Sequence, residues 1–174
     1  MVNHPLRMYD YLTLARQNLL AQIRPLTPEE YGREFAIGPG TIGRTLTHVM
    51  ICEWFYIERL QGHTVPPYAE WPIQDEHPPP FDALEANWTR QARETRRVLE
   101  QERDWDATIE FPAIDIGEGD PRITITATNA DLVTQLVLHE VHHRAQVLNM
   151  LRQLGAPAPD LDFNTLMFTR RPSG

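Results

Sequence analysis

The chain has 174 residues, which suits one domain with its own hydrophobic core, and we predict a single domain over residues 1–174. It carries 24 acidic and 16 basic residues, a formal charge of −8, and an acidic surface repels the phosphates of nucleic acids and anionic lipids. The lone cysteine, Cys52, excludes an internal disulfide and is expected to be a small buried apolar residue. The N-terminus has no signal-like apolar run and no 18-residue apolar stretch occurs elsewhere, so we expect a cytoplasmic protein.

Helical periodicity dominates the first third of the chain. From Pro5 to Ile23 apolar residues recur three and four positions apart, which predicts an amphipathic helix with the proline tolerated in its first turn. The sequence Thr27-Pro28-Glu29-Glu30 has the pattern of a capping box and predicts a short helical turn. After the Ile37-Gly38-Pro39-Gly40 break, a second long helix is predicted from Thr41 to about Leu60, and this helix carries His48.

The middle of the chain alternates between irregular, helical and extended patterns. Residues 61–80 contain six prolines, too many missing hydrogen-bond donors for a helix or a central strand, so we expect a long connection. Apolar residues on one face and charges on the other predict a third long helix from Phe81 to Leu99. Between Ala107 and Thr128 the period changes to two around a Gly117–Pro121 turn, which predicts a small β-hairpin.

A fourth long helix is predicted from Thr128 to Leu154, where Gly155 and Pro157 end it. Four long helices joined by connections of ordinary to long length indicate an all-α fold, a four-helix bundle with the β-hairpin between its third and fourth helices.

The fourth helix holds three of the seven histidines. His139 and His143 are four residues apart, so their side chains leave the same face of the helix and can ligate one ion. His142 points roughly 60° away from that line and is the weaker candidate. Because two histidines on one helix hold a metal only weakly, a third ligand should come from a neighbouring helix. His48 is the best candidate, since it lies within the apolar stretch of the second long helix.

Three neutral imidazoles with one or two waters form an open site. Such a site lets a Zn²⁺-like ion polarise a substrate or lower the pKa of water to about 7. It suits zinc, nickel or iron, and the ligands alone do not choose among these metals. The alternative is structural: His48 as a core histidine satisfied by a hydrogen bond, and His139 and His143 as surface residues.

The segment His139–His143 also satisfies the H-E-x-x-H pattern of zinc proteases, in which Glu140 would be the general base. Such proteases take a further ligand, usually a downstream His or Glu, and here only Asp160 and Asp162 could serve. Glu140 and Arg144 are themselves four residues apart on the apolar side of the helix, a spacing at which they can pair with each other.

His48 and the segment from His139 to Gln146, with its His-x-x-x-His-Arg-x-Gln pattern, resemble the DinB-like superfamily of bacterial DNA-damage-inducible proteins. That superfamily includes S-transferases that use bacillithiol or mycothiol, and mycothiol-dependent maleylpyruvate isomerases. The resemblance covers nearly the whole chain in element order. It implies an up-down-down-up four-helix bundle, frequently dimeric, with a metal held by His48, His139 and His143. The family often has glycine at the position of Ala145, and alanine is small enough for the same close packing.

Two functions follow as competing hypotheses. In the first, the metal activates the thiol of a small cofactor, or a water, for transfer to or hydrolysis of a small electrophile. Gln146, one turn beyond His143, would then orient the bound water or substrate, and Glu53 and Tyr56 are weaker candidates behind the ligands. In the second, the chain is a non-catalytic metal-binding stress-response homodimer that associates through its fourth helix, whose apolar residues cover more than half its circumference.

Overall fold

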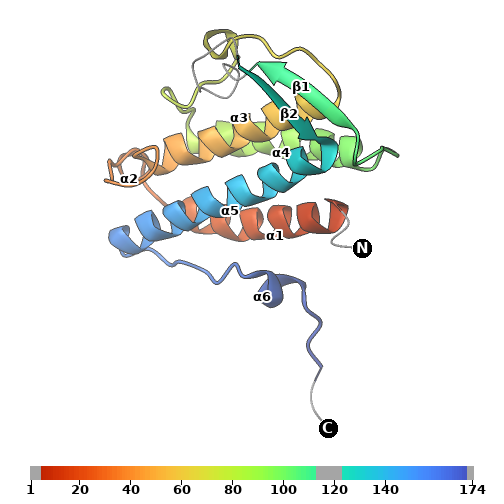
Figure 1. Ribbon diagram of the computed structural model, residues 1–174. Helices are drawn as coiled ribbons and strands as arrows, with labels where there is room; N and C mark the ends of the chain where they lie inside the picture. Colours follow the sequence, from red (N-terminus) through yellow and green to blue (C-terminus); the bar gives the residue numbers. More distant parts are fainter. Residues whose placement is uncertain (1–4, 113–122, 172–174) are drawn as a thin grey trace.

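Four long helices form the body of the molecule in a computed structural model that describes residues 5–112 and 123–171. Along the chain, the second long helix runs antiparallel to the first, the third parallel to the second, and the fourth antiparallel to the third. The order is therefore up-down-down-up, and the predicted four-helix bundle is confirmed (Figure 1). The bounds of these helices are α1 Pro5–Ile23, α3 Ile42–Leu60, α4 Phe81–Leu99 and α5 Asn129–Leu154.

Shorter elements decorate the bundle. They are α2 Pro28–Tyr31, the 3₁₀ turn η1 Tyr68–Glu70, and α6 Phe163–Met167. Strands β1 Thr108–Pro112 and β2 Thr124–Thr128 pair in antiparallel register, which confirms the hairpin, while the turn predicted at 117–121 lies outside the described residues. The hairpin and the proline-rich connection both lie on the α3 side of the bundle (Figure 1).

The ends of the helices follow local sequence. Thr27 accepts a hydrogen bond from the amide of Glu30, whose carboxylate accepts one from the amide of Thr27, so the predicted capping box is present. Thr128 and Asp131 form a second capping box at the start of α5. At the other end of α5, Gly155 has a φ of 73°, the left-handed conformation in which glycine lacks the steric cost of a side chain.

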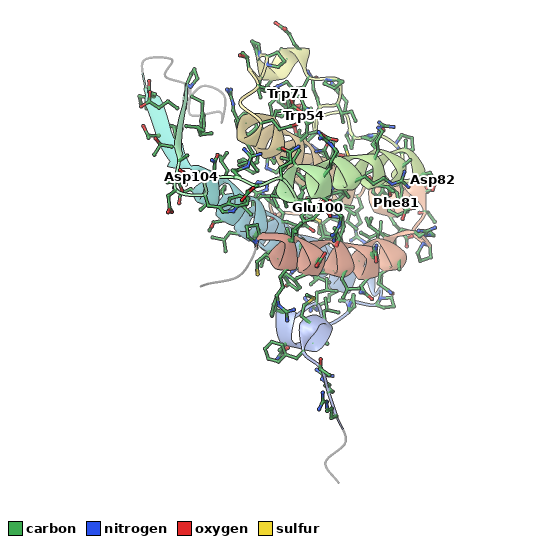
Figure 2. The ribbon with its side chains drawn as sticks, turned by 90° about the vertical axis from the view of Figure 1, so that its right-hand side faces the viewer. Trp54, Trp71, Phe81, Asp82, Glu100 and Asp104 are labelled. Atoms are coloured by element: carbon green, nitrogen blue, oxygen red, sulfur yellow. The ribbon has the colours of Figure 1, made fainter. Side chains whose placement is uncertain are left out.

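The core lies between the four helices, and all four contribute residues that are almost fully buried, among them Leu12, Ala15, Ile42, Ile57, Leu84, Val98, Met150 and Leu151. The outer face of α4 is charged as predicted, with exposed Asp82 and Glu100 near its two ends (Figure 2). The proline-rich connection packs back onto α3 through Trp71, whose ring lies 5.1 Å from that of Trp54 (Figure 2). Among the described residues, no helix is long and apolar enough to span a bilayer.

Candidate metal centre

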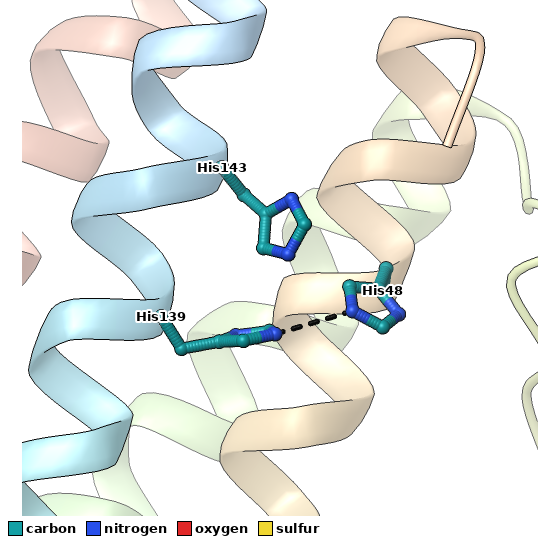
Figure 3. Close-up of side chains that lie close together, drawn as sticks. All are labelled: His48, His139 and His143. Carbon is teal, nitrogen blue, oxygen red and sulfur yellow. Dashed lines mark hydrogen bonds between the residues drawn. The ribbon is translucent and has the colours of Figure 1, made fainter. Parts of the chain in front are cut away.

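Three histidines converge between α3 and α5, the two helices that pack most extensively against each other. Figure 3 shows His48 on α3 facing His139 and His143 on α5. The Nε2 atoms of His48 and His139 are 3.2 Å apart, and one ring nitrogen from each histidine lies within 4.8 Å of the other two. Two nitrogens about 2.0 Å from a tetrahedral zinc ion lie about 3.3 Å apart, so this cluster has the dimensions of a site for one ion.

The outer nitrogens of two of these rings are held by acceptors. Nδ1 of His48 donates to the Asp75 carboxylate at 2.9 Å, and Nδ1 of His143 donates to Oε1 of Gln146 at 2.8 Å. A proton fixed on Nδ1 leaves Nε2 as the nitrogen that faces the centre of the cluster. Hydrogen bonds of this kind orient histidine ligands and raise their basicity in metal sites.

Of these two acceptors, the sequence indicates Gln146 as a site residue but does not indicate Asp75. The sequence suggests that Gln146 orients a bound water or substrate; in the structure its Oε1 accepts from Nδ1 of His143, and its amide donates to His142 at 3.0 Å. His142 is exposed and is not part of the three-histidine group, in line with the weaker candidacy that its angle on the helix indicates. Asp75 was not predicted, because it lies in the proline-rich connection and no periodic spacing relates it to His48.

Asp75 is fastened by its own neighbours. The hydroxyl of Tyr68 contacts the carboxylates of Asp75 and Glu76, and it accepts a hydrogen bond from the amide of Asp75 at 3.1 Å. Burial and these carboxylates raise the pKa of Tyr68, so its hydroxyl stays protonated and can donate. The proline-rich connection is thereby anchored where it meets His48.

The rings differ in their affinity for protons. Burial lowers the pKa of His48, but hydrogen bonds to Asp75 and Cys52 outweigh burial and raise that pKa to about 10. Burial lowers the pKa of His139 to about 3, and the neighbouring His143 and His48 act in the same direction. The pKa of His143 is also lowered, chiefly by burial. Near neutral pH one ring of the cluster is therefore protonated, and the other two are neutral.

Two of the three histidines, His48 and His139, line a cavity of about 840 Å³. Its walls come from α3, α5, the hairpin and the proline-rich connection. The lining surface is mostly apolar, and its apolar residues are Ile51, Phe55, Trp71, Phe111, Ile125, Ala127 and Leu132. Tyr56 lines this cavity with its ring 6.2 Å from that of His139, and its hydroxyl accepts from the Gln135 amide at 3.5 Å. Burial raises the pKa of Tyr56, so its phenol remains a hydrogen-bond donor.

Cys52 also lines the cavity, and its sulfur lies 3.8 Å from Nε2 of His48. It is half-buried, so the expectation of a buried apolar core residue is wrong. Cys52 follows His48 by four residues on α3, and this spacing places both side chains on the face that lines the cavity.

Comparison with known proteins identifies the family. The model of the DinB family matches residues 1–172. This chain belongs to the DinB family. Protein DinB of Bacillus subtilis (strain 168) is 22% identical over 165 residues, which cover 93% of this chain and 92% of that protein. A DinB-like protein from Bacillus cereus ATCC 10987, known from a crystal structure, shares the fold with a TM-score of 0.59 and 18% identity over 88% of this chain and 94% of that one.

The side chains of two acidic residues of this DinB-family chain lie outside the histidine cluster, in the interior of the bundle. Glu53, expected behind the metal ligands, instead accepts hydrogen bonds from Tyr9, Trp88 and Thr95 and is paired with Arg16. The carboxylate of Glu140 is bound by the same Arg16 at 2.6 Å.

The structure thus corrects the pairing expected on α5. Glu140 pairs with Arg16 of α1, and Arg144 donates instead to the hydroxyl of Tyr11. A general base must lie within hydrogen-bond reach of its substrate or of the water that it activates. Glu140 is 4% exposed and bound to a guanidinium, so its placement argues against the zinc-protease alternative.

Proposed function

We propose that the protein holds one divalent metal ion between the Nε2 atoms of His48, His139 and His143, and that it uses this ion to activate the thiol of a small cofactor or a water molecule. The reaction is transfer to, or hydrolysis of, a small electrophilic molecule. The observation that carries the proposal is the convergence of three imidazole nitrogens at the edge of a largely apolar cavity of about 840 Å³.

The donor set fits such an ion. Imidazole nitrogens suit zinc, nickel and iron, and three protein ligands leave coordination positions for a thiol, a water or a substrate. When bound, a divalent ion supplies Lewis acidity and lowers the pKa of a coordinated water or thiol. His48 must give up its Nε2 proton to bind the ion, while the hydrogen bond to Asp75 keeps its Nδ1 proton in place.

The residues around the histidines supply the remaining functions. Asp75 and Gln146 hold two of the ligand rings, so that the rings need not reorder when an ion enters. The apolar walls, with Phe55 and Phe111 on facing elements, hold the body of the substrate and exclude bulk water. Tyr56 keeps its proton and donates a hydrogen bond to an oxygen of the substrate.

The first test is the metal content of purified variants. We expect about one metal ion per chain in the wild type and little in His48→Ala, His139→Ala or His143→Ala by elemental analysis. His63→Ala is the matched control, because His63 is a surface residue outside the cluster, and its ring forms a hydrogen bond with the carboxylate of Glu58. A metal content unchanged in all three cluster variants would overturn the proposal.

The second test is activity. The metal-loaded protein is screened for conjugation of bacillithiol, mycothiol and glutathione to small electrophiles, and for ester hydrolysis. We expect turnover that falls in the His48→Ala variant and persists in the His63→Ala variant. Turnover equal in these two variants would exclude the histidine cluster as its source.

The second candidate function is that of a non-catalytic, metal-binding stress-response homodimer. Leu138 on α5 is 60% exposed, and Val141 and Leu148 lie half-buried on the same helix. An exposed apolar helix face of this kind suits contact with a second copy of the chain. In this case we expect the Leu138→Glu variant to be monomeric, as measured by light scattering. We also expect a chelator to lower the melting temperature of the wild type although the protein turns over no substrate.

The relatives and the net charge of the chain bear on its location and its partners. We propose a cytoplasmic protein, in line with its bacterial DinB relatives. Its net charge of −8 disfavours nucleic acid and anionic membranes as partners, so small molecules and a second copy of the chain are its proposed partners.

A further inference from the structure

A network of buried polar and charged side chains lies beside the histidines. At its centre, Nη2 of Arg16 donates to Glu53 at 2.7 Å and to Glu140 at 2.6 Å, and Nε donates to Glu140 at 3.2 Å. The guanidinium also lies over the indole of Trp88, 4.1 Å from the ring centroid. The side chains of these three charged residues are 2–6% exposed.

This network joins all four long helices. Arg16 comes from α1, Glu53 from α3 and Glu140 from α5. Residues of α1 and α4 complete the shell of Glu53: Tyr9 donates at 2.7 Å, Trp88 at 2.8 Å and Thr95 at 2.6 Å. One carboxylate is thus saturated by four donors in the middle of the bundle.

Stability does not account for this network. Each buried ion loses several kcal/mol of hydration, and well-packed apolar side chains in place of a buried ion pair are often as stable or more so. What directional hydrogen bonds add is a defined register, since an apolar interface tolerates repacking that a saturated polar network does not.

The register in question is that of the metal ligands. Glu140 directly follows His139 on α5, and Glu53 follows His48 by five residues on α3, about 7.5 Å along the helix. A slide of α5 by one turn, about 5.4 Å, would separate the two Nε2 atoms that now lie 3.2 Å apart. Arg16 and Glu140 also border a small internal cavity whose wall includes His143.

We propose that Arg16 is a positioning residue for the metal centre: by binding Glu53 of α3 and Glu140 of α5 on one guanidinium, it sets the register at which His48 meets His139 and His143. This inference rests on the proposed metal binding. It assigns the buried charges a task that the histidines cannot perform themselves, because the rings extend from two separate helices.

The test uses a variant that removes one charge of each sign. Arg16→Met/Glu140→Met leaves the formal charge of the network unchanged, and Glu53 keeps its three neutral donors. We expect a folded protein by circular dichroism whose Zn²⁺ affinity, measured by chelator competition, falls by about tenfold or more. Bound Co²⁺ should also show an altered visible spectrum, which reports the geometry of its ligands.

Val98→Ala is the matched control, because it opens a cavity in α4 at a fully buried residue that takes no part in the network. We expect it to lower the melting temperature without changing the Zn²⁺ affinity or the Co²⁺ spectrum. Equal losses of affinity in Val98→Ala and in the double variant would mean that general destabilisation is the cause, and would overturn the proposal.

Arg16→Lys provides a conservative second variant in case the double variant does not fold. It retains the buried charge but loses the planar fork, and we expect a smaller loss of Zn²⁺ affinity in the same direction. Wild-type affinity and spectrum in a folded Arg16→Lys protein, or in the double variant, would refute the positioning role while His48→Ala still abolishes binding. Metal uptake that survives His48→Ala would instead refute the proposed function.

Discussion

Two clusters of ionisable side chains lie next to each other in this bundle, and they are built in opposite ways. In the charge network, every carboxylate oxygen of Glu53 and Glu140 has a donor, and the side chains are 2–6% exposed. In the histidine cluster, two rings have satisfied outer nitrogens, the inner nitrogens face one another, and the His48 side chain is 30% exposed beside a cavity. A saturated, closed cluster stabilises an arrangement of helices, whereas an open one, whose inner nitrogens converge beside a cavity, can accept a metal ion once His48 gives up its Nε2 proton.

Removal of the arginine from the closed cluster should give the largest effect. Arg16→Ala leaves two buried carboxylates without their cation, and we expect a loss of about 3–5 kcal/mol in the free energy of unfolding. Urea denaturation of the metal-free protein measures this. His139→Ala, the matched change in the open cluster, should cost much less, because His139 is neutral and half-buried. Equal losses for the two variants would remove the distinction between the clusters.

Removal of metal should lower the melting temperature only when the histidine cluster is intact. A ligand at 100 times its dissociation constant stabilises the folded state by about 2.7 kcal/mol. For a chain of this size, this amounts to a shift of about 5–10 °C in the melting temperature. We therefore expect a chelator to lower the melting temperature of the zinc-loaded wild type by this amount and to leave that of His139→Ala unchanged. A drop of the same size in both proteins would place the stabilising metal elsewhere.

A smaller effect should come from the acceptor behind His48. Asp75→Asn keeps the size of the side chain and an oxygen acceptor but removes the negative charge, and we expect Zn²⁺ affinity to fall by about tenfold. Glu76→Gln is the control, because Glu76 contacts Tyr68 and has no hydrogen bond to His48 among the described residues. Unchanged affinity in Asp75→Asn would show that the hydrogen bond to His48 contributes nothing to binding.

The sequence predicts the open cluster better than the closed one, for a physical reason. His139 and His143 are local: their spacing alone puts them on one face of α5, and the apolar periodicity of α3 brings His48 into the bundle. The same periodicities predicted the four helices, and the hairpin was visible as a change of period.

The closed cluster and Asp75 depend on tertiary structure. Arg16 and Glu140 are 124 residues apart, and nothing local distinguishes a charge that faces the core from one that faces solvent. Helical spacing therefore indicates only the local pair, Glu140 with Arg144, whereas the packing of α1 against α5 gives Glu140 a buried partner in Arg16. The position of Asp75 depends on the path of the proline-rich connection, and the sequence of that connection has no periodic pattern from which its path could be predicted.

The most direct measurement of the central claim is a Co²⁺ titration of the wild type and of His48→Ala, followed by visible absorption. Three histidines on two helices should bind one Co²⁺ per chain in the wild type, with the absorption bands of an ion in a nitrogen-rich site, and the variant should show no such bands at the same concentrations. Identical titration curves for the two proteins would contradict the claim that His48, His139 and His143 form one metal site.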